Sequence, residues 1–305
     1  MTTPITVLGP PDDHQVRALR AAAARADVEL RAVHLTATDP QRWRWGADIV
    51  TSEGDVLTDT SGVFVRSMPT PTPHHDTDLI APNRRAEWLR QAERRRAVLG
   101  FHKSAQLTLS ERGTPVINEL WGYRHHRSKP GADAELAAGG VPVPRGIATD
   151  DVGELRSFVD SVAAAVVKPV AGGGRCRVLE PAMLEGALAR RLDQAPVYAQ
   201  ELVPGRNLRI YTLDDDVLAT FDIEADDIDF RGAETSITEI DLPGDIADTA
   251  LRCARLLGLR FTGSDIKWLP DGSHVVLDVN PSPMFAGLDR RIDGRIAAAL
   301  VERLR

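Results

Sequence analysis

TGSDIKWLPDGSHVVLDVNPSPMF, at residues 262–285, is the stretch that decides the fold, and it reads as a strand, a turn and a second strand. Residues 265–268 alternate polar and apolar side chains, as a half-buried strand does. Residues 270–272, Pro-Asp-Gly, have the composition of a tight turn, and the apolar residues 275–277 predict a buried return strand. The sequence therefore predicts a β-hairpin.

Polar side chains gather on one part of this hairpin. Asp265 lies on the first strand, while Asp278 and Asn280, two residues apart, point to the same face of the second. Two carboxylates and a carboxamide would form an all-oxygen ligand set, which suits Mg²⁺ together with substrate phosphates. The alternative is a hairpin whose polar residues only face water. Apolar neighbours on both sides of Asp278 argue against it, because a carboxylate among them needs a partner or a ligand.

The composition is that of a globular protein. The 305 residues suffice for two or three packed units, and 43% hydrophobic and 27% charged residues are ordinary values. The net charge of −7 gives no support to nucleic acid as the main partner. No apolar stretch reaches the roughly 18 residues that span a bilayer, and the N-terminus has no signal-peptide pattern. The chain has two cysteines, Cys176 and Cys253, without zinc-ligand spacing. We therefore expect a cytoplasmic protein with no membrane partner.

The first 117 residues alternate strand-like and helix-like segments. The strand-like runs fall at residues 5–8, 28–35, 49–50 and 62–66. Such alternation predicts a small parallel sheet flanked by helices. The G-x-G-x-x-G dinucleotide fingerprint is absent. His74 and His75 lie in a Pro- and Thr-rich loop, where they are either functional groups or merely solvated.

A helix over residues 83–96 carries an unusual concentration of arginines. They are Arg84, Arg85, Arg90, Arg94, Arg95 and Arg96. A solvated face or a salt-bridged domain contact explains them. Docking of an acidic substrate or of a peptide leader is the alternative.

A second candidate site follows residue 115. The buried run at residues 164–168 ends in Lys168, and a flexible loop with Gly172, Gly173 and Gly174 comes next. A phosphate can approach backbone N–H groups closely where no Cβ intervenes, and a lysine adds a positive charge. Phosphate binding is one interpretation, and a plain glycine-rich hairpin turn is the other.

Residues 207–213 predict a further strand, which meets residues 217–221 across the acidic triplet at positions 214–216. A hairpin turn explains this triplet more simply than a metal site does. Arg209 shares a face of its strand with Asn207 and Tyr211, so we expect it to point inward toward an anion.

These motifs have an informative order along the chain. Lys129 stands before a helix, and Lys168 stands before the glycine loop. Then follow Gln-Glu-Leu-Val at 200–203, Arg209 and the Asp265…Asp278-x-Asn280 set. The ordered set resembles the ATP-grasp carboxylate–amine ligases, and within them the RimK-like branch of glutamate ligases and ribosomal-peptide maturases. By motif the resemblance covers about residues 115–290.

The resemblance implies a fold and a domain organisation. An α/β chain with an α+β C-terminal half is expected, as an ATP-grasp fold preceded by a Rossmann-like pre-ATP-grasp domain. That N-terminal α/β domain would occupy residues 1–117. The central ATP-grasp subdomain would occupy residues 118–195, and the C-terminal subdomain with the metal site residues 196–305.

The resemblance also implies a nucleotide site made of two lysines, a glycine lid and a hinge. Lys129 and Lys168 would contact the ATP phosphates. The residues implied for the lid, the adenine hinge and the ribose contact are Gly172, Gly173, Gly174, Gln200, Glu201, Leu202, Val203 and Asn207.

Catalytic and metal-binding residues are implied in the same way. Arg209 and Arg231 would hold the γ-phosphate and the acyl-phosphate intermediate. Asp265, Asp278 and Asn280 would bind magnesium, with two ions in the site.

Three positions depart from the family pattern. Asp278 replaces the more usual glutamate and is one methylene shorter. Asn207 stands where the family commonly has an acid. After Arg231 the chain lacks the Asn and His-Arg-Gly-Gly pattern of the S6-type glutamate ligases, so their substrate is not carried over.

The implied activity is ATP-dependent ligation. A carboxylate would be activated as an acyl phosphate and joined to an amine, on an amino acid, a small peptide or a ribosomal peptide. The expected partners are therefore ATP, a carboxylate substrate and an amine substrate, and the chain could form a homodimer. The alternatives are an ATP-binding regulatory protein without turnover and a phosphotransferase that stops at the phosphorylated product. The general base is left open among Glu224, Asp229 and the two loop histidines.

Overall fold

The computed structural model describes residues 3–34, 43–46, 48–51, 56–68, 81–171, 174–229 and 232–305. Several residues singled out above lie outside these ranges: His74, His75, Gly172, Gly173 and Arg231. The chain forms two compact units, one from Met1–Leu120 with Met284–Arg305 and one from Trp121–Pro283. The three ranges expected from the sequence stay a proposal, and residues 284–305 group with the N-terminal unit.

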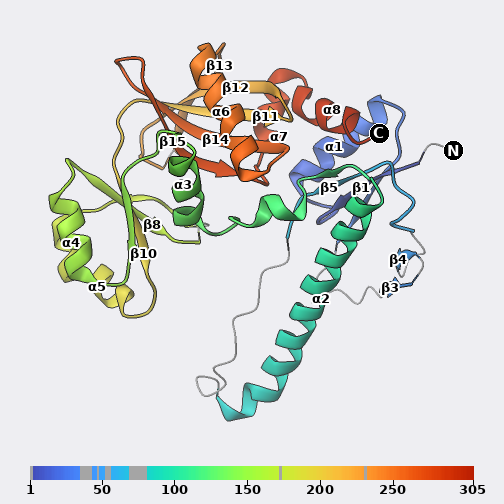
Figure 1. Cartoon of the computed structure of the whole chain (residues 1–305), viewed down its shortest axis with the longest axis horizontal. Helices are drawn as coiled ribbons and strands as arrows, with labels where there is room; N and C mark the ends of the chain where they lie inside the picture. The colour runs from blue at the N-terminus through green and yellow to red at the C-terminus, as the bar shows by residue number, and fades with distance from the viewer. Residues whose placement is uncertain are drawn as a thin grey trace. The chain divides into compact units, whose positions relative to one another are not determined.

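The first unit contains the predicted parallel sheet. Its strands are β1 (Ile5–Leu8), β2 (Leu30–Val33), β5 (Gly62–Val65) and β6 (Val116–Ile117), in the order β2-β1-β5-β6. All three neighbouring pairs run parallel, and Figure 1 labels β1 and β5 of this sheet. The strand expected near Ile49 is not part of this sheet. As β4 (Ile49–Thr51) it pairs antiparallel with β3 (Trp43–Trp45), because so short a connection permits only a hairpin.

The helices of this unit differ from the sequence prediction in length. They are α1 (His14–Arg25), η2 (Pro82–Arg84), α2 (Arg85–Glu111), α7 (Ala286–Asp289), η5 (Arg290–Ile292) and α8 (Arg295–Glu302). The arginine-rich helix continues to Glu111, well past the expected end at residue 96. The helical residues at the C-terminal end are interrupted between η5 and α8, because Asp293 and Gly294 adopt left-handed φ values of 56° and 79°. Among the described residues no helix is long and apolar enough to cross a membrane.

The second unit holds two antiparallel sheets. The first consists of β7 (Gly146–Thr149), β8 (Ala165–Pro169), β9 (Arg177–Val178) and β10 (Val197–Glu201), in the order β7-β10-β8-β9. One face packs on α4 (Val152–Asp160), η4 (Pro181–Glu185) and α5 (Ala187–Leu192) through Leu155, Leu184 and Leu188. Because side chains alternate along a strand, Lys168, Tyr198 and Gln200 lie on the opposite face.

The second sheet of this unit carries the hairpin. Its strands are β11 (Arg206–Leu213), β12 (Asp216–Ala225), β13 (Glu234–Glu239), β14 (Phe261–Trp268) and β15 (His274–Asn280), in the order β13-β12-β11-β14-β15. The core beneath it includes residues of α3 (Lys129–Ala138) and α6 (Gly244–Leu257), while η3 (Leu120–Tyr123) precedes α3. Cys253 is fully buried in this core.

A β-bulge in the hairpin decides which way Asp278 points. Asp265 pairs with Asp278 while the next residue, Ile266, pairs with Val276, so Leu277 is an extra residue in β15. In a regular strand residues 276 and 278 would share a face. The extra residue breaks that alternation, so Val276 and Val279 are buried while Asp278 turns to the other face.

Gly205→Ala is expected to lower the melting temperature of the protein. Gly205 precedes β11 with φ +125°, and a Cβ there would lie 2.5 Å from the Trp268 carbonyl oxygen. Such backbone strain costs about 1–3 kcal/mol before the clash is added. Gly272→Ala is the matched control, because its φ is +87° and its Cβ would meet nothing within 4 Å. Equal losses of melting temperature in the two variants would contradict the contribution of the clash.

Candidate functional site

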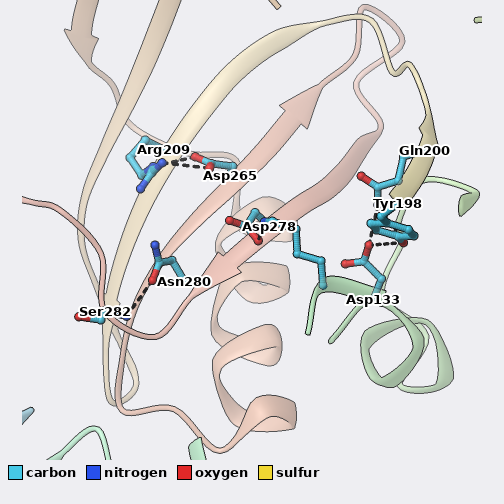
Figure 2. A network of polar contacts seen from close by, with 9 residues as sticks. Asp133, Tyr198, Gln200, Arg209, Asp265, Asp278, Asn280 and Ser282 are labelled. Atoms are coloured by element: carbon cyan, nitrogen blue, oxygen red, sulfur yellow. Dashed lines mark hydrogen bonds and ion pairs between the residues drawn. The ribbon is translucent and has the colours of Figure 1, made fainter. Parts of the chain in front are cut away.

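The candidate site begins at the hairpin, where the two predicted carboxylates face each other. Asp265 and Asp278 are Cα partners across β14 and β15, and Asn280 pairs with Gly263. Figure 2 shows Asp265, Asp278 and Asn280 along this part of the sheet. The juxtaposition expected from the sequence is therefore present.

Arg209 extends this group from the neighbouring strand. Arg209 on β11 is the Cα partner of Asp265, and its guanidinium forms a fork on that carboxylate, with Nε–Oδ1 at 2.7 Å and Nη2–Oδ2 at 2.9 Å (Figure 2). The side chains are only 13% and 18% exposed. Burial raises the pKa of Asp265, although Arg209 opposes the rise. Arg209 thus points inward as predicted, and its anion is a carboxylate of the same sheet.

Lys129 brings a second cation to the hairpin. Its Nζ lies 2.5 Å from Asp278 Oδ1, although 149 residues separate the two in sequence. Burial alone would raise the pKa of Asp278, but Lys129, Lys168 and Arg209 outweigh it and lower that pKa. Asp278 is therefore an ionised carboxylate surrounded by positive charge.

The donor set suits a hard cation. Asp265 and Asp278 offer carboxylate oxygens, and Asn280 Oδ1, which accepts the Ser282 N–H at 2.9 Å, keeps a second lone pair. Within the described ranges no group of three or more His, Cys, Asp or Glu residues could hold a metal by itself. Two carboxylates and an amide fit Mg²⁺, which leaves several positions to water and phosphate oxygens.

Lys168 lies on the other sheet of the same unit. It is the Cα partner of Tyr198, and its Nζ stands 5.3 Å from the centroid of the Tyr198 ring. Burial and the charge of Lys129 lower the pKa of Lys168, whereas Asp278 and Asp133 counteract that shift. The two lysines expected to work together are thus close enough to influence each other. Gly174, the described end of the glycine loop, packs against Pro169.

The predicted hinge is held by backbone bonds on both sides. Glu201 N–H donates to the Arg145 carbonyl and Leu202 N–H to the Ala164 carbonyl, both at 2.9 Å. Val203 continues the partly buried segment. Gln200 is buried and directs its side chain into the protein, and Asn207 Nδ2 donates to the Ile223 carbonyl at 3.1 Å. Strand β10 ends at Glu201, so Leu202 and Val203 lie just beyond it.

The remaining sequence candidates lie in different surroundings. Asp214 forms the expected hairpin turn, with φ 53°, and binds Arg260. Asp229 accepts the Cys176 N–H at 3.1 Å. Glu224 is exposed.

Residues that the sequence analysis missed complete the site. Asp133 on α3 is 8% exposed and bonds Tyr198 and Gln200. Gly263 leaves the space next to the Arg209 guanidinium, because a Cβ there would lie 3.3 Å from Nη1 and 2.5 Å from Pro283 Cβ. The spacing of Lys129 and Asp133, four residues apart on one helix face, was the available signal for Asp133.

Lys168 lies on one antiparallel sheet and the opposed carboxylates lie on a second, as the resemblance to ATP-grasp enzymes implies. More particularly, the chain belongs to the RimK-like ATP-grasp domain family, whose model matches residues 136–304. The resemblance noted from the sequence is thereby confirmed. The family uses ATP and Mg²⁺, and the chain is an ATP-dependent ligase.

Solved structures extend the similarity to the whole chain. The ATP-grasp ligase PsnB complexed with a minimal precursor is 32% identical, with a TM-score of 0.83, and the match covers 100% of this chain and 99% of PsnB. A PsnB structure with minimal precursor, Mg and ADP is 30% identical, with a TM-score of 0.79, and the match covers 100% of this chain and 98% of that one.

Curated relatives match part of the chain. The tetrahydromethanopterin:alpha-L-glutamate ligase of Methanocaldococcus jannaschii is 26% identical over 204 residues, which is 62% of this chain and 70% of that protein. The D-alanine–D-alanine ligase of Cereibacter sphaeroides is 35% identical over 155 residues, 46% of this chain and 50% of that one.

Proposed function

We propose that this ligase phosphorylates a carboxylate of a ribosomally made peptide with ATP and joins the resulting acyl group to an amine or hydroxyl of the same peptide. The observation that carries the proposal is the opposed Asp265–Asp278 pair within reach of Lys129 and Arg209. Similarity over the full length to a ligase solved with a precursor peptide supports a peptide substrate over a free amino acid.

The first step transfers the γ-phosphoryl group of ATP to the substrate carboxylate and releases ADP. Transfer of this kind depends on positioning and on charge neutralisation. Lys129 and Lys168 would bind the phosphates, and Lys129 can keep Asp278 while donating to a phosphate because an ammonium has three N–H groups. Asp265, Asp278 and Asn280 would hold Mg²⁺, which when bound neutralises phosphate charge. We propose two ions, and counting bound Mn²⁺ by titration would test that number.

The remaining nucleotide contacts follow from the same proposal. Glu201, Leu202 and Val203, with Gln200, would form the adenine hinge, and Asn207 would approach the ribose. The glycines at 172–174 would cover the phosphates.

The second step replaces phosphate by the nucleophile. An amine or hydroxyl attacks the acyl carbon, the C–O bond to phosphate breaks, and the nucleophile loses its proton. The negative charge that develops on the acyl oxygen needs fixed donors nearby. Arg209 and Arg231 are the residues proposed for that charge.

A trapping experiment tests the proposal. The purified protein is incubated with Mg²⁺, ATP, hydroxylamine and a candidate precursor peptide, taken from any short reading frame found beside its gene. We expect ATP-dependent formation of a peptide hydroxamate with equal amounts of ADP and free phosphate. Without hydroxylamine, the peptide should lose the mass of one water for each bond formed.

Controls separate the competing activities. Omission of the peptide should leave ADP at background. A regulatory protein would bind ATP but release no ADP, and a phosphotransferase would release ADP without free phosphate. Either result would overturn the proposal.

Two further properties belong to this proposal. We place the ligase in the cytoplasm, where ATP is available and where the thiols of Cys176 and Cys253 stay reduced. We also propose a homodimer, which light scattering of the purified protein would test.

A further inference from the structure

A buried polar cluster lies beside the two lysines of the candidate site, and two of its members, Asp133 and Tyr198, have no role in the steps above. Asp133 Oδ2 accepts hydrogen bonds from the Tyr198 hydroxyl at 2.6 Å and from Gln200 Nε2 at 2.5 Å, as Figure 2 shows. Gln200 Nε2 also lies 3.2 Å from the Tyr198 hydroxyl. A carboxylate that is 8% exposed is expensive to bury unless it is bonded, so these contacts hold all three side chains in place.

The location of each partner is set by secondary structure. Tyr198 and Gln200 are two residues apart on β10 and share a face. Asp133 sits one helical turn after Lys129 on α3, so both side chains project from one side of that helix. Gly146 on β7 leaves room for the tyrosine, because a Cβ there would lie 2.7 Å from its hydroxyl oxygen. The Tyr198 ring therefore has little freedom to rotate or shift.

The cluster ends at Lys168. Tyr198 faces Lys168 across β10 and β8, and the ammonium stands 5.3 Å from the ring centroid, within the range of a cation–π contact. The charge of Asp133 also favours the protonated form of Lys168, against burial and the repulsion from Lys129. Asp133 thus influences Lys168 both through the ring of Tyr198 and through its charge.

We propose that Asp133 is a positioning residue for the nucleotide: by fixing the Tyr198 ring through its hydroxyl, it holds the Lys168 ammonium where the phosphates of ATP bind. The inference rests on the proposed role of Lys168 in binding ATP. Asp133 itself touches neither nucleotide nor substrate in this assignment. A purely structural role, in which Asp133 only ties α3 to β10, is the competing explanation.

The test measures binding of Mg²⁺ and the non-hydrolysable analogue AMP-PNP by calorimetry. We expect Asp133→Asn to weaken binding about tenfold, a size typical of residues that orient a binding group. Tyr198→Leu, which removes the ring face, should cost about tenfold, and Tyr198→Phe, which keeps the ring but frees it from Asp133, about threefold. Affinity of Asp133→Asn should also fall more steeply as pH rises, because Lys168 loses its proton more readily.

A double-variant cycle distinguishes positioning from structure. If Asp133 acts through Lys168, Asp133→Asn should change affinity by less than about twofold in a Lys168→Met background. Glu135→Gln is the matched control, since Glu135 is on the same helix and pairs with Arg124 and His125 instead. It is expected to leave affinity unchanged. Tyr198→Phe in the same background repeats the cycle if Asp133→Asn does not fold.

The possible outcomes separate this inference from the proposed function. Unchanged affinity in Lys168→Met would overturn the assigned role of Lys168 and the inference with it. A weakened Lys168→Met together with an additive or absent effect of Asp133→Asn would overturn the inference alone. Lower melting temperature with unchanged affinity in Asp133→Asn would establish the structural role.

Discussion

Asp278→Ala is expected to reduce Mg²⁺-dependent ATP turnover at least about 10²-fold while the protein stays folded. Asp278 lies opposite Asp265, is 35% exposed, and is approached by Lys129 at 2.5 Å. Its removal would take away an oxygen donor and leave the positive charges of the site unbalanced. Because neighbouring cations lower the pKa of Asp278, the carboxylate is ionised at neutral pH and its protonation cannot mimic the variant there.

Two companion variants make this result specific. Asp278→Glu adds one methylene and restores the residue that the family usually has, so partial turnover should remain. Asp271→Ala removes an exposed carboxylate from the turn of the same hairpin, where it bonds Ser273, and should leave turnover unchanged. Affinity for Mn²⁺ in the presence of ADP is a second readout, and it should fall in Asp278→Ala only. Near-normal turnover and Mn²⁺ affinity in Asp278→Ala would move the metal site elsewhere.

The sequence was sufficient to predict this hairpin because its signals are local. Pro-Asp-Gly favours a turn, and the apolar residues after it favour a return strand, so Asp265 had to lie near Asp278. The bulge at Leu277 was not predictable in this way. The burial of both Val276 and Val279 stabilises the bulge, and that burial depends on the core beneath the sheet rather than on residues next in sequence.

Long-range contacts were harder still to foresee. The partner of Asp278 is Lys129, 149 residues earlier, and the sequence pattern does not indicate that the two residues are close in space. Apart from its spacing from Lys129, the sequence gives no sign of the role of Asp133, because its burial depends on Tyr198 and Gln200 of a strand far along the chain. The end of α2 was not predicted either, but for a local reason. The prediction rested on the arginine-rich beginning of the helix and did not follow the helix to Glu111.

The last prediction concerns Arg209. Its partner in the structure is Asp265, and this pairing competes with the proposed role of Arg209. Its guanidinium forks onto Asp265, and each side chain is less than one-fifth exposed. Removal of one partner of such a buried pair typically costs about 3–5 kcal/mol of stability. Loss of activity in Arg209→Ala therefore needs a measurement of folding beside it.

Arg209→Lys is the more informative substitution. It keeps a positive charge next to Asp265 but loses the planar fork that can grip phosphate or carboxylate oxygens bidentately. We expect hydroxamate formation to fall at least about tenfold in Arg209→Lys and about 10²–10³-fold in Arg209→Ala. Affinity for ATP should fall much less, because the guanidinium would act on charge that develops during transfer.

The direction in which the Mn²⁺ affinity of Arg209→Ala changes is the decisive measurement. Since Arg209 occupies both oxygens of Asp265, its removal frees that carboxylate, and Mn²⁺ should bind Arg209→Ala at least as tightly as the unaltered protein. Arg206→Ala is the matched control, because Arg206 lies on the same strand and pairs with Asp222 from an exposed position. Because Arg206 is half exposed, its pair with Asp222 contributes little, so its loss should spare hydroxamate formation. Undiminished hydroxamate in Arg209→Ala would show that the residue only stabilises the sheet, and Arg231 would then be the better candidate for the developing charge.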